Sequence, residues 1–225
     1  GSAVNPVLRE GNSDRRAAKA VKEYAQKHPH TMGAWSKDSL THVSHMSQGD
    51  FYGTEKSVVM DKDDTLKIEF VGADNQIMQL GKNIQVEAGE VVDGAYMSRT
   101  ALCQFYAEQI KDAKAKGVLW SLHLKATMMK ISDPIMFGHA VRAYYERALN
   151  KHAAVFEELR FDANNGIGDA YDKIKSLPAE QCALIKADLD ACLAEGPDLA
   201  MVDSSRGITN LHVPSDVIID ASMPA

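Results

Sequence analysis

The sequence predicts a mixed α/β (α+β) protein, in which a β-rich part at about residues 55–97 precedes alternating helices and strands at about 98–225. In the first part, short strand-forming runs are separated by turn residues. In the second, helical periodicity alternates with apolar runs. The composition, 45% hydrophobic and 25% charged over 225 residues, is typical of an ordinary soluble globular protein and not of a disordered one.

The first expected element is a helix that begins after Asn12-Ser13-Asp14, a capping sequence followed by good helix formers. Pro29 ends this helix, and Arg15 and Arg16 lie in its first turn. The stretch from residue 28 to residue 53 has no sustained period, which predicts a long irregular connection.

The β-rich part contains five runs with strand character, at Ser57–Met60, Leu66–Val71, Gln76–Leu80, Ile84–Ala88 and Glu90–Ala95. Turn sequences separate them, among them Asp61-Lys62-Asp63-Asp64 and Gly72-Ala73-Asp74-Asn75. Because each run follows the previous one after a short turn, we expect an antiparallel meander.

After Ser98, a predicted cap, apolar residues recur at helical spacing until Gly117, which predicts an amphipathic helix closed by a glycine. These apolar residues are Leu102, Phe105, Tyr106, Ile110 and Ala113. The apolar run Val118–Leu124 then predicts a central strand. Further helices are expected at Asp133–Leu149, His152–Leu159 and Pro178–Leu193, and late strands at Leu199–Val202 and Val217–Ile219.

The formal net charge of −6 argues against a general nucleic-acid binder, whose phosphate contacts need clustered basic residues. Residues 1–40 nevertheless carry seven basic side chains against four acidic ones, so an anion is expected to bind there. Three well-separated cysteines without a CxxC pair suit a reducing compartment, and we expect a cytoplasmic protein.

No apolar run reaches the length of a membrane span, and the N-terminus has no secretory profile, so no membrane partner is expected. The chain has no initiator Met and stops shortly after an apolar run. We therefore expect a piece of a larger protein.

The first candidate site is a carboxylate cradle in and just before the first helix. Its hydroxyl, amide and guanidinium groups would lie near a helix N-terminus, where unpaired N–H groups and the helix dipole also attract anions. The residues are Ser2, Asn5, Arg9, Arg15 and Arg16. The alternatives are solvated arginines and, for Gly1-Ser2, a cloning remnant.

The second candidate is Lys125, with Lys130, at the end of the apolar run Val118–Leu124. The carboxyl end of a strand in an α/β sheet is where ligands bind, and partial burial lowers a lysine pKa toward use in proton transfer. A lysine whose stem covers apolar surface at a strand end is the alternative.

The third candidate is the pair Asp216 and Asp220, whose carboxylates flank Val217–Ile219 and suit a hard divalent cation, although loop aspartates are the alternative. Asp162–Asp169 is similar to a calcium or phosphate loop, but Lys173 occupies the position where calcium requires Glu, so we expect a turn and helix cap. His42 and His45 lack further zinc ligands, and no zinc is predicted.

Several long motifs together closely resemble the monomeric-type NADP-dependent isocitrate dehydrogenase of bacteria. They lie at Gly1–Arg16, Lys27–His30, Met32–Ser36, Gly49–Gly53, His123–Lys130, Asn164–Asp169 and Gly207–Asp216. The family's enzyme is much longer, so the resemblance implies an internal segment, mostly of the large domain, with an isocitrate/isopropylmalate dehydrogenase-like fold. Residues 1–16 would be a substrate-binding segment and 17–225 the large-domain segment, with the NADP domain absent.

The resemblance implies oxidative decarboxylation of isocitrate to 2-oxoglutarate with reduction of NADP and a Mg or Mn ion. Lys125 matches the catalytic lysine and Asp220 one metal-ligating aspartate. Asn5 is also expected to reach the nicotinamide side of the site. The residues that match the substrate-binding motif are Ser2, Asn5, Arg9 and Arg15.

The tyrosine that partners the lysine, the other metal ligands, a further substrate arginine and the NADP-binding segments of the family match nothing in this chain. We therefore expect a monomeric parent enzyme, a segment that packs against its missing domain, and little or no turnover by the isolated chain. Two other functions stay open: a non-catalytic anion-binding module that uses the basic head alone, and a metal-dependent lyase or hydrolase that uses Lys125 and Asp220 without NADP.

Overall fold

The computed structural model describes residues 19–29, 34–124, 129 and 131–213, and the chain divides into two compact units. One unit is residues 45–102. The other contains the described residues up to Ser44 and from Cys103 onward. The mixture of helices and small sheets confirms the coarse α/β prediction.

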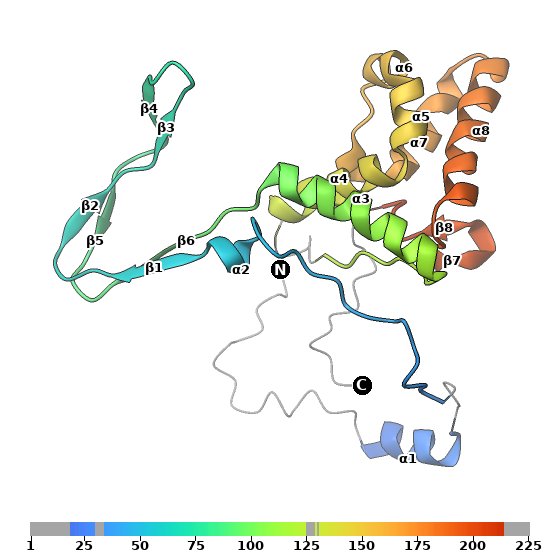
Figure 1. Cartoon of the computed structure of the whole chain (residues 1–225), viewed down its shortest axis with the longest axis horizontal. Coiled ribbons are helices and arrows are strands. Elements are labelled where there is room, and N and C mark those ends of the chain that lie inside the picture. Colours follow the sequence, from blue (N-terminus) through green and yellow to red (C-terminus); the bar gives the residue numbers. More distant parts are fainter. Residues whose placement is uncertain (1–18, 30–33, 125–128, 130, 214–225) are drawn as a thin grey trace. The chain divides into compact units, whose positions relative to one another are not determined.

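The 45–102 unit is a long two-stranded antiparallel ribbon (Figure 1), preceded by the short helix α2 at Phe51–Thr54. The pairing is nested: β1 pairs with β6, β2 with β5, and β3 with β4. The expected meander is therefore wrong, since a meander pairs each strand with the next, and the run expected at 66–71 is two strands. The strands are β1 (Lys56–Val59), β2 (Asp64–Leu66), β3 (Glu69–Val71), β4 (Ile77–Gln79), β5 (Ile84–Val86) and β6 (Val91–Gly94).

Only one of the predicted turns reverses the ribbon. At its tip, the Gly72 N–H donates to the Gln76 carbonyl at 2.9 Å. The aspartate-rich segment 61–64 does not reverse the chain, because Met60 stays paired across the ribbon. The Met60 N–H donates to the Glu90 carbonyl at 2.9 Å, and the Gly89 N–H donates to the Met60 carbonyl at 2.7 Å. Turn-forming residues at 61–64 therefore interrupt the strand without ending the pairing.

The other unit is mainly helical, and the predicted helices are confirmed wherever the chain is described. The helix expected at 133–149 is two helices that meet at Tyr145. The helices are α1 (Lys19–Lys27), α3 (Arg99–Lys116), α4 (Ser132–Tyr144), α5 (Glu146–Lys151), α6 (Ala153–Glu158), α7 (Ile167–Lys173) and α8 (Ala179–Glu195), with single 3-10 turns η2 (Ala163–Asn165), η3 (Ile174–Ser176) and η4 (Ser204–Arg206). No helix in the described part of the chain is long and apolar enough to span a membrane.

Helix α3 ends at the predicted glycine. The Gly117 N–H donates to the Lys114 carbonyl at 3.2 Å and the Val118 N–H to the Ala113 carbonyl at 3.0 Å, the pair of bonds that defines a Schellman motif. The predicted apolar stripe of α3 is buried or half-buried along its length.

Helices α4 to α8 enclose one hydrophobic core (Figure 1). The largest fully buried side chains are Val141, Tyr145, Ile167, Ile174, Ile185, Leu189 and Leu211. From the run 118–124, Trp120, Leu122 and Leu124 pack against this core. The helical core therefore holds the extended segment that leads to residue 125.

The expected central strand at Val118–Leu124 is wrong as a sheet strand: the run makes a single parallel bridge, Trp120 to Leu199. The physical reason is Asn210. A longer parallel ladder would use the Ala200 and Leu122 carbonyls next. Asn210 occupies both, through its backbone N–H at 2.8 Å and its side-chain amide at 2.9 Å.

The late strand expected at Leu199–Val202 is confirmed as β7 (Met201–Asp203), which begins two residues later and pairs antiparallel with β8 (Ile208–Thr209). The strand expected at Val217–Ile219 lies outside the described residues.

Candidate functional site

The residues predicted to carry the chemistry lie outside the described part of the chain. This applies to the cradle at Ser2, Asn5, Arg9, Arg15 and Arg16, to Lys125 and Lys130, and to Asp216 and Asp220. What the structure describes is the framework that leads to them along the chain: α1, the run 118–124, and the segment 208–213.

The run 118–124 is extended, with strict alternation between two faces. Val118, Trp120, Leu122 and Leu124 are half-buried, whereas Leu119, Ser121 and His123 are exposed. The Trp120 N–H donates to the Asp198 carbonyl at 2.7 Å, and the Ala200 N–H donates to the Trp120 carbonyl at 3.1 Å. The burial of the run therefore has a period of two, and the run presents one exposed face, with Leu119, Ser121 and His123, away from the helical core.

The segment 208–213 is fixed at the N-terminus of α7. The Ile167 N–H donates to the Leu211 carbonyl at 2.9 Å, and the Gly168 N–H donates to the His212 carbonyl at 3.0 Å. The imidazole of His212 stacks on Tyr171 with ring centroids 5.7 Å apart, and burial lowers the pKa of His212. This packing holds the chain up to residue 213, three residues before Asp216.

Asp162–Asp169 forms the expected turn and cap. The Asp162 carboxylate accepts from the Asn164 N–H at 2.9 Å, and the Asp169 carboxylate accepts from the Asp162 N–H at 3.0 Å. Lys173 lies 2.8 Å from the Asp169 carboxylate. Both carboxylates thus have local partners, and the predicted turn and helix cap is confirmed.

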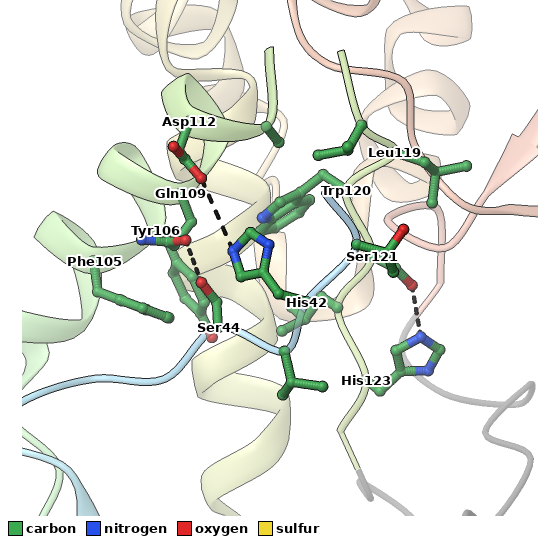
Figure 2. A pocket seen from close by; sticks show the side chains of 15 residues that line it. His42, Ser44, Phe105, Tyr106, Gln109, Asp112, Leu119, Trp120, Ser121 and His123 are labelled. Atoms are coloured by element: carbon green, nitrogen blue, oxygen red, sulfur yellow. Dashed lines mark hydrogen bonds and ion pairs between the residues drawn. The ribbon is translucent and has the colours of Figure 1, made fainter. Parts of the chain in front are cut away.

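A pocket of about 610 Å³ lies beside the run 118–124 (Figure 2). One wall is the loop 41–44, a second is a face of α3, and the third is the extended run. The side chains with polar atoms that line it are Thr41, His42, Ser44, Tyr106, Gln109, Asp112, Trp120, Ser121 and His123. The residues come from three separate stretches of the sequence.

Three polar pairs line the pocket (Figure 2). The Ser44 hydroxyl donates to Gln109, and the Ser121 hydroxyl lies 2.6 Å from His123 Nε2. The Nδ1 of His42 donates to the Leu40 carbonyl at 2.8 Å, since a carbonyl only accepts, and its Nε2 faces Asp112 at 4.0 Å.

The Asp112 carboxylate also binds Lys116 at 2.7 Å. Both charged groups are more than one third exposed, so this ion pair contributes little to stability. The Asp112 carboxylate nevertheless places a negative charge in the pocket next to the His42 imidazole.

The floor of the pocket is aromatic. Tyr106 is buried, and burial raises the pKa of its phenol well above the usual range. The Tyr106 ring meets Trp120 edge to face, with centroids 6.3 Å apart. Trp120 in turn stacks on Tyr144 at 6.3 Å. The floor is therefore apolar and uncharged at neutral pH.

The pocket does not match a tricarboxylate by itself, because its described lining offers two imidazoles and one carboxylate and no lysine or arginine. Among the described residues, no group of three His, Cys, Asp or Glu side chains is placed to hold a metal ion. The sequence favours a polar surface loop over a zinc site at His42, and it gives no signal for Ser44, Gln109 and Asp112, because these contacts join residues far apart in the chain.

A family model described as monomeric isocitrate dehydrogenase matches residues 1–225. The chain is 60% identical to isocitrate dehydrogenase (NADP) 2 of Colwellia maris and 59% identical to isocitrate dehydrogenase (NADP) of Azotobacter vinelandii. It is 56% identical to isocitrate dehydrogenase (NADP) 2 of Mycobacterium tuberculosis. Each match covers 100% of this chain and 30% of the relative, so the chain spans less than a third of the length of these relatives.

Proposed function

The chain belongs to the monomeric isocitrate dehydrogenase family, and from that premise we propose that it is part of an enzyme that oxidatively decarboxylates isocitrate to 2-oxoglutarate with reduction of NADP. The observation that carries the proposal is the match over all 225 residues, at 51–60% identity to relatives named as NADP isocitrate dehydrogenases. Because the chain spans only 30% of those relatives, the activity is proposed for the longer parent protein.

In this proposal, residues 1–16 bind the substrate. Arg9 and Arg15 neutralise carboxylates of isocitrate that otherwise repel one another, and Ser2 and Asn5 orient the molecule by hydrogen bonds. Asn5 also contacts the nicotinamide side of NADP. Residues 17–225 are the large-domain segment that supports this head.

Lys125 is proposed to carry the proton to and from the substrate hydroxyl and the enolate that remains after CO₂ leaves. In the described run, Leu119, Ser121 and His123 are exposed at every second position, and Lys125 is the next position of that series in the sequence.

Asp220 is proposed as one carboxylate ligand of Mg or Mn, a hard cation that prefers oxygen donors. The other metal ligands of the family match nothing in this chain, and they are proposed to belong to other parts of the parent. The bound ion would supply positive charge for the substrate oxygens, and NADP would take up the hydride.

The isolated chain is proposed to have little or no turnover, and the parent to be a monomer. The three cysteines are free thiols, which supports the proposal of a reducing, cytoplasmic compartment.

The substrate role of the head is tested by steady-state NADPH formation in the full-length parent. Arg9→Gln and Arg15→Gln are each expected to raise KM for isocitrate by about 10-fold or more, because each removes a charge-assisted hydrogen bond. Lys22→Gln is the matched control, since Lys22 is an exposed cation of α1 outside the motif. An equal change in KM for Arg15→Gln and Lys22→Gln would exclude a specific substrate contact.

A further inference from the structure

Asn210 bridges two segments that lead, along the chain, to different proposed site residues. It lies in the segment 208–213, which precedes Asp220. Its side-chain Nδ2 donates to the Leu122 carbonyl at 2.9 Å, and Leu122 is three residues before Lys125 in the sequence. The two bonded residues are 88 positions apart. One side-chain amide therefore ties the segment before the proposed metal ligand to the segment before the proposed proton carrier.

A tight turn anchors Asn210 from its own side. Its backbone N–H donates to the Ala200 carbonyl at 2.8 Å. The His212 N–H donates to the Thr209 carbonyl at 3.1 Å, and the Thr209 N–H donates to His212 Nδ1 at 3.1 Å, so two bonds close the turn around Asn210. Because an N–H only donates, Nδ1 is the unprotonated nitrogen of a neutral imidazole, the form that the buried surroundings of His212 also favour by lowering its pKa. The amide of Asn210 is thus presented from a fixed turn.

The run 118–124 needs such an anchor beyond its single β-bridge. That bridge pairs Trp120 with Leu199. Further along, Leu122 and Leu124 pack against the helical core, and apolar contacts of this kind are not directional. The hydrogen bond from Asn210 to the Leu122 carbonyl is directional, so it fixes the backbone of the run shortly before Lys125.

The amide of Asn210 serves as a donor at this position. Its Oδ1 is buried and has no hydrogen-bond partner among the described residues. An unpaired buried acceptor is destabilising, and a leucine of nearly the same shape would not carry one. Stability alone therefore does not account for an asparagine here, whereas the Nδ2 bond to Leu122 requires a side-chain donor of this length.

We propose that Asn210 is a positioning residue for the reaction of the parent enzyme, because through the Leu122 carbonyl it sets where the chain presents Lys125. The inference rests on the proposed function, in which Lys125 carries the proton. Only three residues separate the anchored carbonyl from Lys125, so little chain is left to absorb a displacement. A misplacement of about 1 Å in an active site costs about 10²-fold in rate. Asn210 acts through the backbone and not by contact with the substrate.

The kinetic test uses the full-length parent with Asn210→Leu, which keeps the branched shape and removes the donor. Tyr144→Phe is the matched control, since it also removes one buried hydrogen bond to a backbone carbonyl, that of Pro197 at 2.7 Å, outside both segments. Asn210→Leu is expected to lower kcat by about 10-fold or more and to change KM for isocitrate by less than about 3-fold, because residues 1–16 bind the substrate in the proposed function. Tyr144→Phe is expected to keep its kcat.

A double-mutant cycle separates positioning from general damage to the fold. In the Lys125→Met background, Asn210→Leu is expected to leave the residual kcat unchanged within about 2-fold, since Asn210 acts through the missing lysine. The same loss factor in both backgrounds overturns the proposal.

Lys125 is also measured without turnover. Competitive acetylation with acetic anhydride over a pH series, followed by mass spectrometry, gives the pH midpoint of Lys125 labelling, with the exposed Lys22 as internal reference. Asn210→Leu is expected to shift the Lys125 midpoint by about half a pH unit or more, because the surroundings of the ammonium change, and Tyr144→Phe is expected to leave it unchanged. Asn210→Asp, which has the same outline and no donor when ionised, decides if Asn210→Leu does not fold.

The two proposals fail separately. An unchanged Lys125 midpoint in a folded Asn210 variant overturns this inference alone. A parent whose Lys125 midpoint shifts as expected in Asn210→Leu, but which forms no NADPH from isocitrate, contradicts the proposed function alone.

Discussion

Replacing Gly166 by alanine is expected to loosen the attachment of the segment 208–213 to helix α7. Gly166 has φ 86° and ψ 172°, a conformation that residues with a side chain rarely adopt. A Cβ at this position would lie 2.1 Å from the His212 carbonyl oxygen and 2.5 Å from its carbon. Both atoms belong to the backbone, so no side-chain rotation relieves the overlap.

The magnitude follows from the backbone and from two hydrogen bonds. The strained conformation costs about 1–3 kcal/mol for a non-glycine residue. Moving the His212 backbone away breaks the bonds from Ile167 N–H to Leu211 and from Gly168 N–H to His212, each worth about 0.5–1.5 kcal/mol. We therefore expect Gly166→Ala to destabilise this attachment by about 2–6 kcal/mol.

Gly207→Ala is the matched control. Gly207 also has positive φ, at 70°, but nothing lies within 4 Å of a Cβ placed there. Its expected cost is about 1–2 kcal/mol, from the backbone alone. The assay is hydrogen exchange in the full-length parent, read as the opening free energy of the Ile167 and Gly168 amides. If both variants lower that free energy equally, the close approach of Gly166 to His212 is not what requires glycine.

Two further predictions concern pH. The Tyr144 hydroxyl donates to the Pro197 carbonyl at 2.7 Å, and burial raises the pKa of Tyr144 to about 12. The contribution of the protonated Tyr144 to the free energy of unfolding is therefore present below pH ~10 and is lost as pH rises through 12. Tyr144→Phe is therefore expected to destabilise the parent by about 1–2 kcal/mol at pH 8 and by about 1 kcal/mol less at pH 11 in urea titrations, and a pH-independent difference would contradict this. The Asp188 carboxylate accepts from Lys151 at 2.9 Å and from His152 at 2.6 Å, and these bonds hold the pKa of Asp188 below its ordinary value. Asp188→Asn is expected to lower the free energy of unfolding by about 1–2 kcal/mol at pH 7, and by less as pH falls through that lowered pKa. The same urea titrations measure this difference, and a difference that grows toward low pH would refute the prediction.

Local signals predicted the helices well. Gly117 ended α3 with the expected pair of hydrogen bonds, and the helices after residue 130 began near the predicted prolines and caps. These features depend on residues within one or two turns, which a single sequence contains.

Contacts between distant residues explain what the sequence did not predict. The nested pairing of the ribbon depends on which turn reverses the chain. The residues at 61–64 and at 72–75 are all typical of turns, so they do not show that the chain reverses at 72–75 and continues through 61–64. The run 118–124 has the period of a strand, but Asn210, far along the chain, occupies the carbonyls that would extend its ladder.

The described pocket was missed for the same reason, since the Ser44–Gln109 contact spans 65 positions and has no local period. The predicted site residues, in contrast, rest on the family resemblance. Arg9, Lys125 and Asp220 lie outside the described residues, and their roles stay predictions.

The most direct test of the account is NADPH formation from isocitrate and NADP with Mn²⁺ by the full-length parent, beside its Lys125→Met variant and the isolated 225-residue chain. We expect turnover by the parent and little or none by the isolated chain. We also expect a loss of kcat of about 10²-fold or more in Lys125→Met, with isocitrate binding retained in calorimetry. A parent without activity, or a Lys125→Met variant that keeps its kcat, would contradict the central claim.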